Sequence, residues 1–101
     1  MKQTQLDKEA LRRLYQTILR LETEEDCDAF FEDICTIKEL QDLCQRLQVA
    51  TLLHDGKNYQ EVSLATGAST ATICRVNKCL MYGSGGYRRA LSKRDEEEKQ
   101  A

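Results

Sequence analysis

The segment from Tyr59 to Lys78 reads YQEVSLATGASTATICRVNK, and its pattern decides the fold. Two short stretches with helical apolar spacing flank Gly67, a residue that adopts the left-handed conformation of a tight turn at no steric cost. The apolar residues spaced to hold the second stretch against the first are Val62, Ile73 and Val76. Two short helices joined by a tight turn form a helix-turn-helix, which we predict over about residues 59–80.

Apolar residues upstream of this motif also repeat at three- and four-residue spacing, which is typical of helices. We expect a first helix over about residues 5–21 and a short second helix that Thr23 can cap. Thr36, followed three residues later by Glu39, forms a capping box, and it opens a third helix that stops at Gly56. The upstream half of the chain is therefore predicted to be helical throughout.

Caps and glycines also divide the rest of the chain. Asn58 and Ser69 can cap the two helices of the motif, because their side chains accept hydrogen bonds from free backbone amides. A glycine-rich break follows, and a last helix is expected from residue 87 to about residue 93. We predict an all-α fold of six helices in one domain over residues 1–94. The charged tail, residues 95–101, is expected to be disordered.

The small size of the chain favours a homodimer. Six helices in 101 residues bury only a modest fraction of their surface. The first predicted helix is long and amphipathic, and Leu40, Leu43 and Leu47 of the third stand at coiled-coil spacing. Packing of these stripes within a single chain is the alternative. We expect a second copy of the chain to complete the core.

Net charge alone argues against a nucleic-acid partner, because 15 basic and 17 acidic residues leave the chain at −2. The distribution of charge argues the opposite. Residues 69–94 hold six basic residues and no acidic one, whereas residues 1–55 hold seven basic and twelve acidic residues. Positive charge is therefore gathered on and after the motif, where it can neutralise the phosphates of double-stranded DNA.

The second helix of the motif is predicted to enter the major groove. Short hydroxyl and methyl side chains at its start let the backbone approach base edges, thymine methyl groups and phosphates, and the positive end of the helix dipole favours phosphate. The candidate DNA-binding residues are Ser69, Thr70, Ala71, Thr72, Arg75 and Lys78. Two alternatives are a helical hairpin that only packs and a protein-interaction module that uses the motif as a scaffold for a transcription partner.

Other classes of function lack their sequence signatures. The chain has neither a membrane span nor a signal peptide, so we expect a cytoplasmic protein without a membrane partner. No nucleophile, base and orienting residue can be named together, so we expect no enzyme, and the lone His54, expected at a helix end, has no metal partners. The cysteines fit neither a disulfide framework nor a zinc site, and we expect buried free thiols, with a redox switch as the alternative. They are Cys27, Cys35, Cys44, Cys74 and Cys79.

Two short runs carry a resemblance to a known family. Gly67-Ala68, followed by Ala71-Thr72-Ile73-Cys74-Arg75, is similar to the reading helix of the Trp repressor family, and the likeness extends over residues 36–80. The run from Tyr82 to Arg89 looks like the YerC/YecD-like branch of this superfamily. The resemblance implies an intertwined six-helix homodimer that regulates transcription, as a repressor, by reading a two-fold symmetric operator.

The resemblance also implies a site for a small-molecule corepressor, with candidate contacts at Thr36, Arg46, Arg75 and Cys79. Val76 departs from the family pattern, which has glycine there, and Cys79 stands in place of a serine. Valine fills space that an indole ring would use, and a thiol is a weaker hydrogen-bonding group than a hydroxyl. We therefore expect an effector other than tryptophan, or none, and no resident cofactor.

Overall fold

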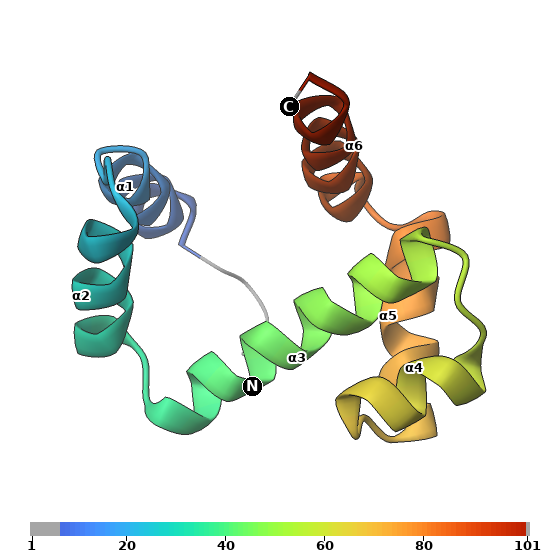
Figure 1. The fold of residues 1–101 in the computed structure, drawn as a ribbon. Helices are drawn as coiled ribbons and strands as arrows, with labels where there is room; N and C mark the ends of the chain where they lie inside the picture. The colour runs from blue at the N-terminus through green and yellow to red at the C-terminus, as the bar shows by residue number, and fades with distance from the viewer. Residues whose placement is uncertain (1–6, 101) are drawn as a thin grey trace. The chain divides into compact units, whose positions relative to one another are not determined.

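The computed structural model describes residues 7–100, which form six α-helices and no strand (Figure 1). This part of the chain therefore has the all-α fold that the sequence predicts. No helix within it is long and apolar enough to cross a membrane. In chain order the helices are α1 (Lys8–Ile18), α2 (Glu24–Ile34), α3 (Ile37–His54), α4 (Tyr59–Thr66), α5 (Thr70–Tyr82) and α6 (Gly86–Gln100).

The chain divides into two compact units, one reaching to Leu40 and the other beginning at Gln41. The sequence does not predict this division, because helical spacing continues unbroken through α3. No residue between 7 and 40 is buried, whereas the second unit holds all the buried residues of the described chain. The first unit therefore has no core of its own within a single chain.

α1 is shorter than the helix expected over residues 5–21. The side chain of Asp7 caps it by accepting hydrogen bonds from two backbone amides at 2.9 and 3.3 Å, and the two residues expected before this cap lie outside the described part. The helix ends at Ile18, whose carbonyl accepts a hydrogen bond from the amide of Leu21 at 3.1 Å. After this tightened turn the backbone becomes extended at Thr23, which caps α2. The residues after Ile18 therefore lead into the cap of α2 instead of continuing α1.

The caps predicted for α2 and α3 are present. Thr23 Oγ1 accepts a hydrogen bond from the amide of Asp26 at 3.0 Å. Thr36 Oγ1 accepts one from the amide of Glu39 at 3.1 Å, and Glu39 Oε1 accepts one from the amide of Thr36 at 2.8 Å. After the last residue of α3, Gly56 takes a φ of +93°, which confirms it as the stop signal.

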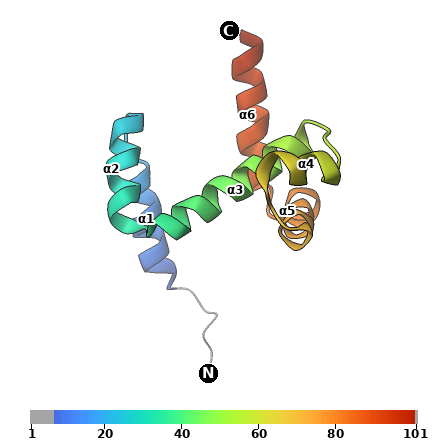
Figure 2. The ribbon, with the colours of Figure 1, turned by 60° about the horizontal axis from the view of Figure 1, so that its bottom comes forward.

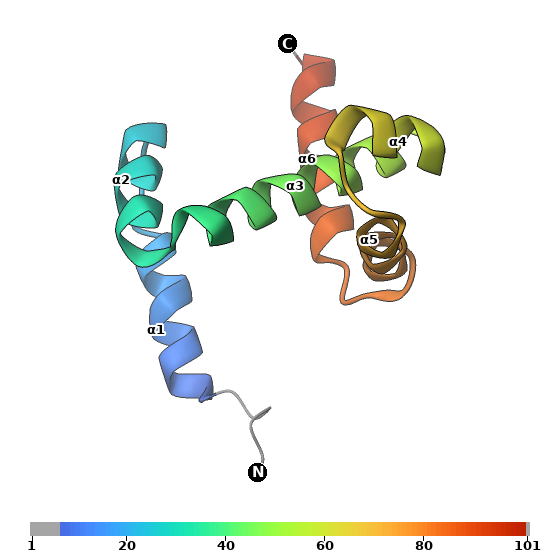
Figure 3. The same cartoon turned by 90° about the horizontal axis from the view of Figure 1, so that it is seen from below.

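The core of the second unit joins four helices. In Figures 2 and 3, α5 is seen nearly along its axis, and α4 lies across it. The largest fully buried side chains are Val49, Val62 and Ile73, and burying each one contributes about 1.5–3 kcal/mol. The helix-turn-helix is thereby fixed against the C-terminal part of α3. The buried residues are Val49, Ala50, Val62, Ala68, Ile73, Val76, Leu80 and Leu91.

α6 is longer than the sequence predicts. The expectation of a helix ending near Lys93 is wrong, because α6 continues to Gln100, through most of the tail expected over residues 95–101. Asp95 lies 2.9 Å from His54 at the end of α3, and this contact anchors the polar second half of the helix. The last residue of the chain lies outside the described part.

The expectation of buried thiols is also wrong. All five cysteines are free, as expected, but four of them are exposed and Cys35 is half-buried. Cys74 and Cys79 directly adjoin the buried Ile73 and Leu80 in the sequence. Because the helix rotates by about 100° per residue, neighbours of a core position point away from the core. These two thiols therefore stand beside the apolar stripe rather than within it.

Candidate nucleic-acid interface

Gly67 ends α4 and sets the direction in which α5 begins. Its φ is +71°, and its amide donates a hydrogen bond to a carbonyl in the last turn of α4 at 2.9 Å. At the other end of α4, Asn58 Oδ1 accepts from the amide of Glu61, and Glu61 Oε1 accepts from the amide of Asn58, both at 2.9 Å. Within the turn, Thr66 Oγ1 accepts a hydrogen bond from the amide of Ala68 at 3.1 Å. The predicted helix-turn-helix is therefore present.

The first turn of α5 leaves backbone donors free. Ser69 Oγ accepts a hydrogen bond from the amide of Thr72 at 3.1 Å, and its hydroxyl donates to Thr72 Oγ1 at 3.1 Å. The amides of Thr70 and Ala71 have no acceptor within residues 7–100. Free amides at the start of a helix, together with the helix dipole, attract phosphate groups. Ser69 is thus a cap that shapes this end of the helix.

All six candidate DNA-binding residues lie at the start of α5 or in its first nine positions. Thr72 is half-buried because it faces its capping serine, and the other five are exposed. Ala71, Arg75 and Lys78 are four and three residues apart, so they share one face of the helix. The exposed members are Ser69, Thr70, Ala71, Arg75 and Lys78.

Only part of the predicted basic cluster is available to a ligand. Arg88 donates from Nε to the carbonyl of Leu80 at 2.9 Å, and Arg94 pairs with Asp55 at 2.8 Å. The side chains of the other four basic residues are exposed and have no hydrogen bond or ion pair within residues 7–100. They are Arg75, Lys78, Arg89 and Lys93. Counting charge along the sequence therefore overstates the cationic surface that DNA can reach.

Of the candidate effector residues, Cys79 lines the pocket at the joint between α5 and α6. Thr36 caps α3 in the first unit. In the second unit, Arg46 is half-buried on α3 and Arg75 is exposed on α5. Cys79 lines a pocket to which neither arginine contributes. Arg75 and Cys79 are four residues apart and share one face of α5, but only Cys79 lines this pocket.

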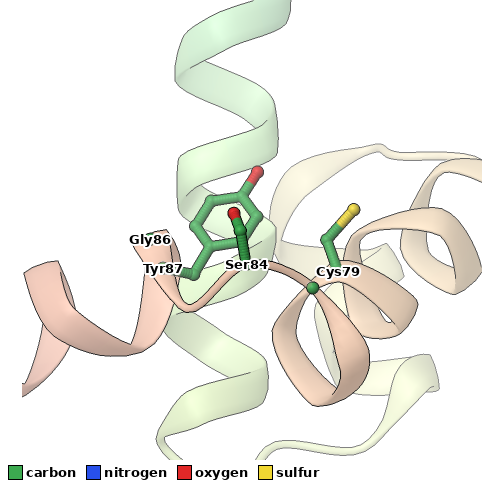
Figure 4. A pocket seen from close by; sticks show the side chains of 5 residues that line it. Cys79, Ser84, Gly86 and Tyr87 are labelled. Carbon is green, nitrogen blue, oxygen red and sulfur yellow. The ribbon is translucent and has the colours of Figure 1, made fainter.

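This pocket has a volume of about 400 Å³ and lies at the joint between α5 and α6 (Figure 4). Figure 4 shows the Tyr87 ring and the Cys79 thiol on either side of Ser84. Two glycines complete the lining, Gly83 and Gly86. An aromatic ring, a thiol and a hydroxyl without a charged group favour a small uncharged ligand over an anionic one.

Sequence reasoning missed an ion-pair cluster where the end of α3 meets α6, made of His54, Asp55, Arg94 and Asp95. Arg94 Nη2 donates to Asp55 Oδ1 at 2.8 Å and to Asp95 Oδ1 at 2.6 Å. His54 Nε2 lies 2.9 Å from Asp95 Oδ2, and it carries the proton because a carboxylate can only accept. No local spacing could have predicted a contact between residues 41 positions apart.

The charges in this ion-pair cluster stabilise one another. The hydrogen bond from His54, followed by the one from Arg94, holds the pKa of Asp95 below its ordinary value. Hydrogen bonds to Asp55 and Asp95 hold the pKa of Arg94 above its ordinary value. The Asp95 carboxylate and the Arg94 guanidinium therefore stay charged over the physiological range of pH.

Three members of the cluster also have the spacing of metal ligands. His54, Asp55 and Asp95 offer ligand atoms that lie within 4.8 Å of one another. However, the guanidinium of Arg94 already bonds both carboxylates, and the imidazole is bonded to Asp95. The donor atoms are satisfied within the protein, so this arrangement fits an ion-pair cluster better than a metal centre.

Comparison with known proteins places these features in a family. The family model described as "Trp repressor protein" matches residues 9–95. The protein YerC of Bacillus subtilis (strain 168) is 47% identical over 97 residues, which cover 93% of each chain.

Two solved structures resemble this one closely. A TrpR-like protein from Eubacterium eligens ATCC 27750 superimposes with a TM-score of 0.82 at 45% identity, covering 84% of this chain and 88% of that one. A putative Trp repressor from Staphylococcus aureus superimposes with a TM-score of 0.86 at 42% identity, covering 94% and 95%. The matches therefore extend well beyond the helix-turn-helix.

Proposed function

The chain belongs to the Trp repressor family, in the branch that contains YerC, and from this membership we propose that it is a sequence-specific DNA-binding regulator, acting as a repressor. The family is one of DNA-binding regulators. The observation that carries the proposal is the exposed start of α5, where hydroxyl, methyl and cationic side chains lie together on the second helix of a helix-turn-helix.

In this proposal α5 lies with its first turns in the major groove. Thr70 and Ala71 meet base edges and thymine methyl groups, while Arg75 and Lys78 contact phosphates. The free amides at the start of the helix add further phosphate contacts. Affinity then comes mainly from the backbone of the DNA, and sequence preference comes from the short side chains of the first turn.

We also propose that the regulator is a homodimer that reads a two-fold symmetric operator. Leu43 and Leu47 of α3 are 46% and 51% exposed, although they stand at the spacing of a packed helix face. The first unit has no buried residue. A second copy covering these surfaces would complete the single domain expected over residues 1–94. It would also set two α5 helices about 34–36 Å apart, one turn of DNA.

We propose that any effector differs from tryptophan. Val76 is 2% exposed, and its side chain belongs to the core between α4 and α5. The pocket at Cys79 has no cationic lining residue, so the carboxylate of an amino acid would find no partner there. Thr36, Arg46 and Arg75 are candidate contacts in a dimer that brings them together. A small uncharged molecule, or no effector, fits these observations better than an amino acid.

Selection of bound genomic fragments at about 0.1 M salt tests the function. We expect weaker binding to all fragments in Arg75→Ala, and enrichment of a two-fold symmetric sequence that is lost in Thr70→Ala. Lys99→Ala, which removes one positive charge from the last turn of α6, should keep it. Weak binding without sequence preference, unchanged by the first two substitutions, would contradict the proposal. Repeating the selection with a panel of amino acids tests the effector.

A further inference from the structure

Arg88 ties α6 to the last turn of α5. Its guanidinium donates from Nε to the carbonyl of Leu80 at 2.9 Å and from Nη2 to the carbonyl of Met81 at 3.1 Å. The last carbonyls of a helix have no partner within that helix, so a two-pronged donor here satisfies two of them at once. Arg88 therefore fixes the C-terminal end of α5 to the start of α6.

The other attachment of α6 is to the end of α3. Leu91 is buried in the core of the second unit, and one turn later the ion-pair cluster joins Arg94 and Asp95 to His54 and Asp55. The two polar attachments, at Arg88 and at the cluster, are roughly 9 Å apart along the helix axis. α6 thus connects the C-terminal ends of α3 and α5.

We propose that α6 positions the reading helix, with Arg88 and the His54–Asp55–Arg94–Asp95 ion-pair cluster as its positioning residues. This inference rests on the proposed DNA-binding function. The core holds α5 through Ile73, Val76 and Leu80, while its C-terminal end depends on α6. A helix that is already ordered in its binding orientation loses less freedom when it docks into the groove. Loosening α6 should therefore weaken specific binding, even though these residues need not contact a base.

Asp95→Ala and Glu97→Ala form a matched pair. Each removes one negative charge from α6, but only Asp95 belongs to the cluster, and the exposed side chain of Glu97 has no hydrogen bond or ion pair within residues 7–100. Electrostatics alone predicts that both variants bind DNA slightly more tightly. If the cluster positions α5, the affinity of Asp95→Ala for the selected sequence should be at least about threefold lower than that of Glu97→Ala. Equal binding by the two folded variants would overturn the proposal.

Arg88→Met and Arg89→Met form the second pair, and they test the positioning role of α6 even if Asp95→Ala does not fold. Both remove one positive charge, and the exposed side chain of Arg89 has no hydrogen bond or ion pair within residues 7–100. The loss of a phosphate contact would reduce the salt dependence of nonspecific binding by about 0.9 in slope. We expect Arg88→Met to leave that slope unchanged and to lose specific binding. A reduced slope with equal loss on all sequences would instead assign Arg88 to phosphate contact and overturn its positioning role.

Hydrogen exchange of α5 separates this inference from the function on which it rests. Without DNA, Asp95→Ala and Arg88→Met should speed exchange of the amides over residues 76–82 by about threefold or more relative to Glu97→Ala and Arg89→Met. If the natural chain selects no DNA sequence, the proposed function fails, and these rates still decide whether α6 orders α5. Unchanged rates in both variants would overturn the positioning.

Discussion

The imidazole Nε2 of His54 lies 2.9 Å from Oδ2 of Asp95, although 41 positions separate these residues in the sequence. The contact joins the last residue of α3 to the second half of α6. Since the pKa of Asp95 is held below its ordinary value, chiefly by this hydrogen bond, the contact is also linked to stability.

Asp95→Asn should make the free energy of unfolding depend less on pH in the acidic range. A carboxylate whose pKa is lowered on folding stabilises the folded state above its ordinary pKa of about 3.9, and this contribution is lost as pH falls through the lowered folded-state value. The free energy of unfolding, measured with urea between pH 7 and pH 2, should therefore differ between the natural chain and Asp95→Asn at neutral pH and converge in acid. Glu97→Gln controls for the lost charge. A constant difference over the whole range would contradict the linkage.

Gly83→Ala and Gly86→Ala should have opposite effects on stability. A Cβ on Gly83 would collide with the carbonyl oxygen of Cys79, which accepts the hydrogen bond that closes α5, whereas a Cβ on Gly86 would meet nothing within 4 Å. Collision with backbone should cost about 1–3 kcal/mol, while alanine in the first turn of α6 should gain about 0.5–1 kcal/mol. Thermal unfolding of the two variants measures both effects. Equal melting temperatures would show that this loop adapts.

The sequence predicts the features that depend on residues close together in the chain. The capping pairs Thr36 with Glu39 and Asn58 with Glu61 form because each needs only a hydroxyl or amide and a carboxylate three residues apart. The length of α6 could not be predicted in this way. Its polar second half is helical where a distant residue, His54, pairs with it.

The same limit applies to the candidate site. Helical spacing correctly predicts that Thr70 and Ala71 are exposed beside the buried Ile73. It does not reveal that Arg88 and Arg94 are engaged with protein acceptors, because those acceptors belong to other helices. Charge counted along a sequence therefore marks a binding region, while the structure decides which cations are available.

Ile73→Ala should destabilise the second unit strongly. Ile73 is 1% exposed and fills the contact between α4 and α5, so truncation leaves a cavity that should cost about 2–5 kcal/mol. Leu64→Ala, on the exposed side of α4 where the side chain is 83% exposed, is the matched control and should change stability by less than about 0.5 kcal/mol. Chemical denaturation measures both, and a small effect of Ile73→Ala would mean that the core can collapse around the missing atoms.

Leu47→Glu should separate the proposed dimer into monomers. In light scattering at micromolar concentration, the natural chain is expected at about twice its mass of 11.6 kDa. A carboxylate in an apolar interface would be desolvated without a partner, so the variant should scatter as a monomer. Gln48→Glu adds the same charge at the next exposed position and should leave the dimer intact. If the natural chain also scatters as a monomer, the proposed homodimer is contradicted.

Thr70→Ala and Lys78→Ala should weaken DNA binding in different ways. Lys78 is exposed two turns into α5, and as a phosphate contact its loss should weaken binding to all sequences alike and lower the salt slope by about 0.9. Thr70, at the first position of the helix, should lose about 1–3 kcal/mol on the selected operator alone, with the salt slope unchanged. Titration of operator and scrambled DNA at several salt concentrations measures both quantities. If Thr70→Ala instead weakens binding to both DNAs equally, the first turn of α5 does not read the bases.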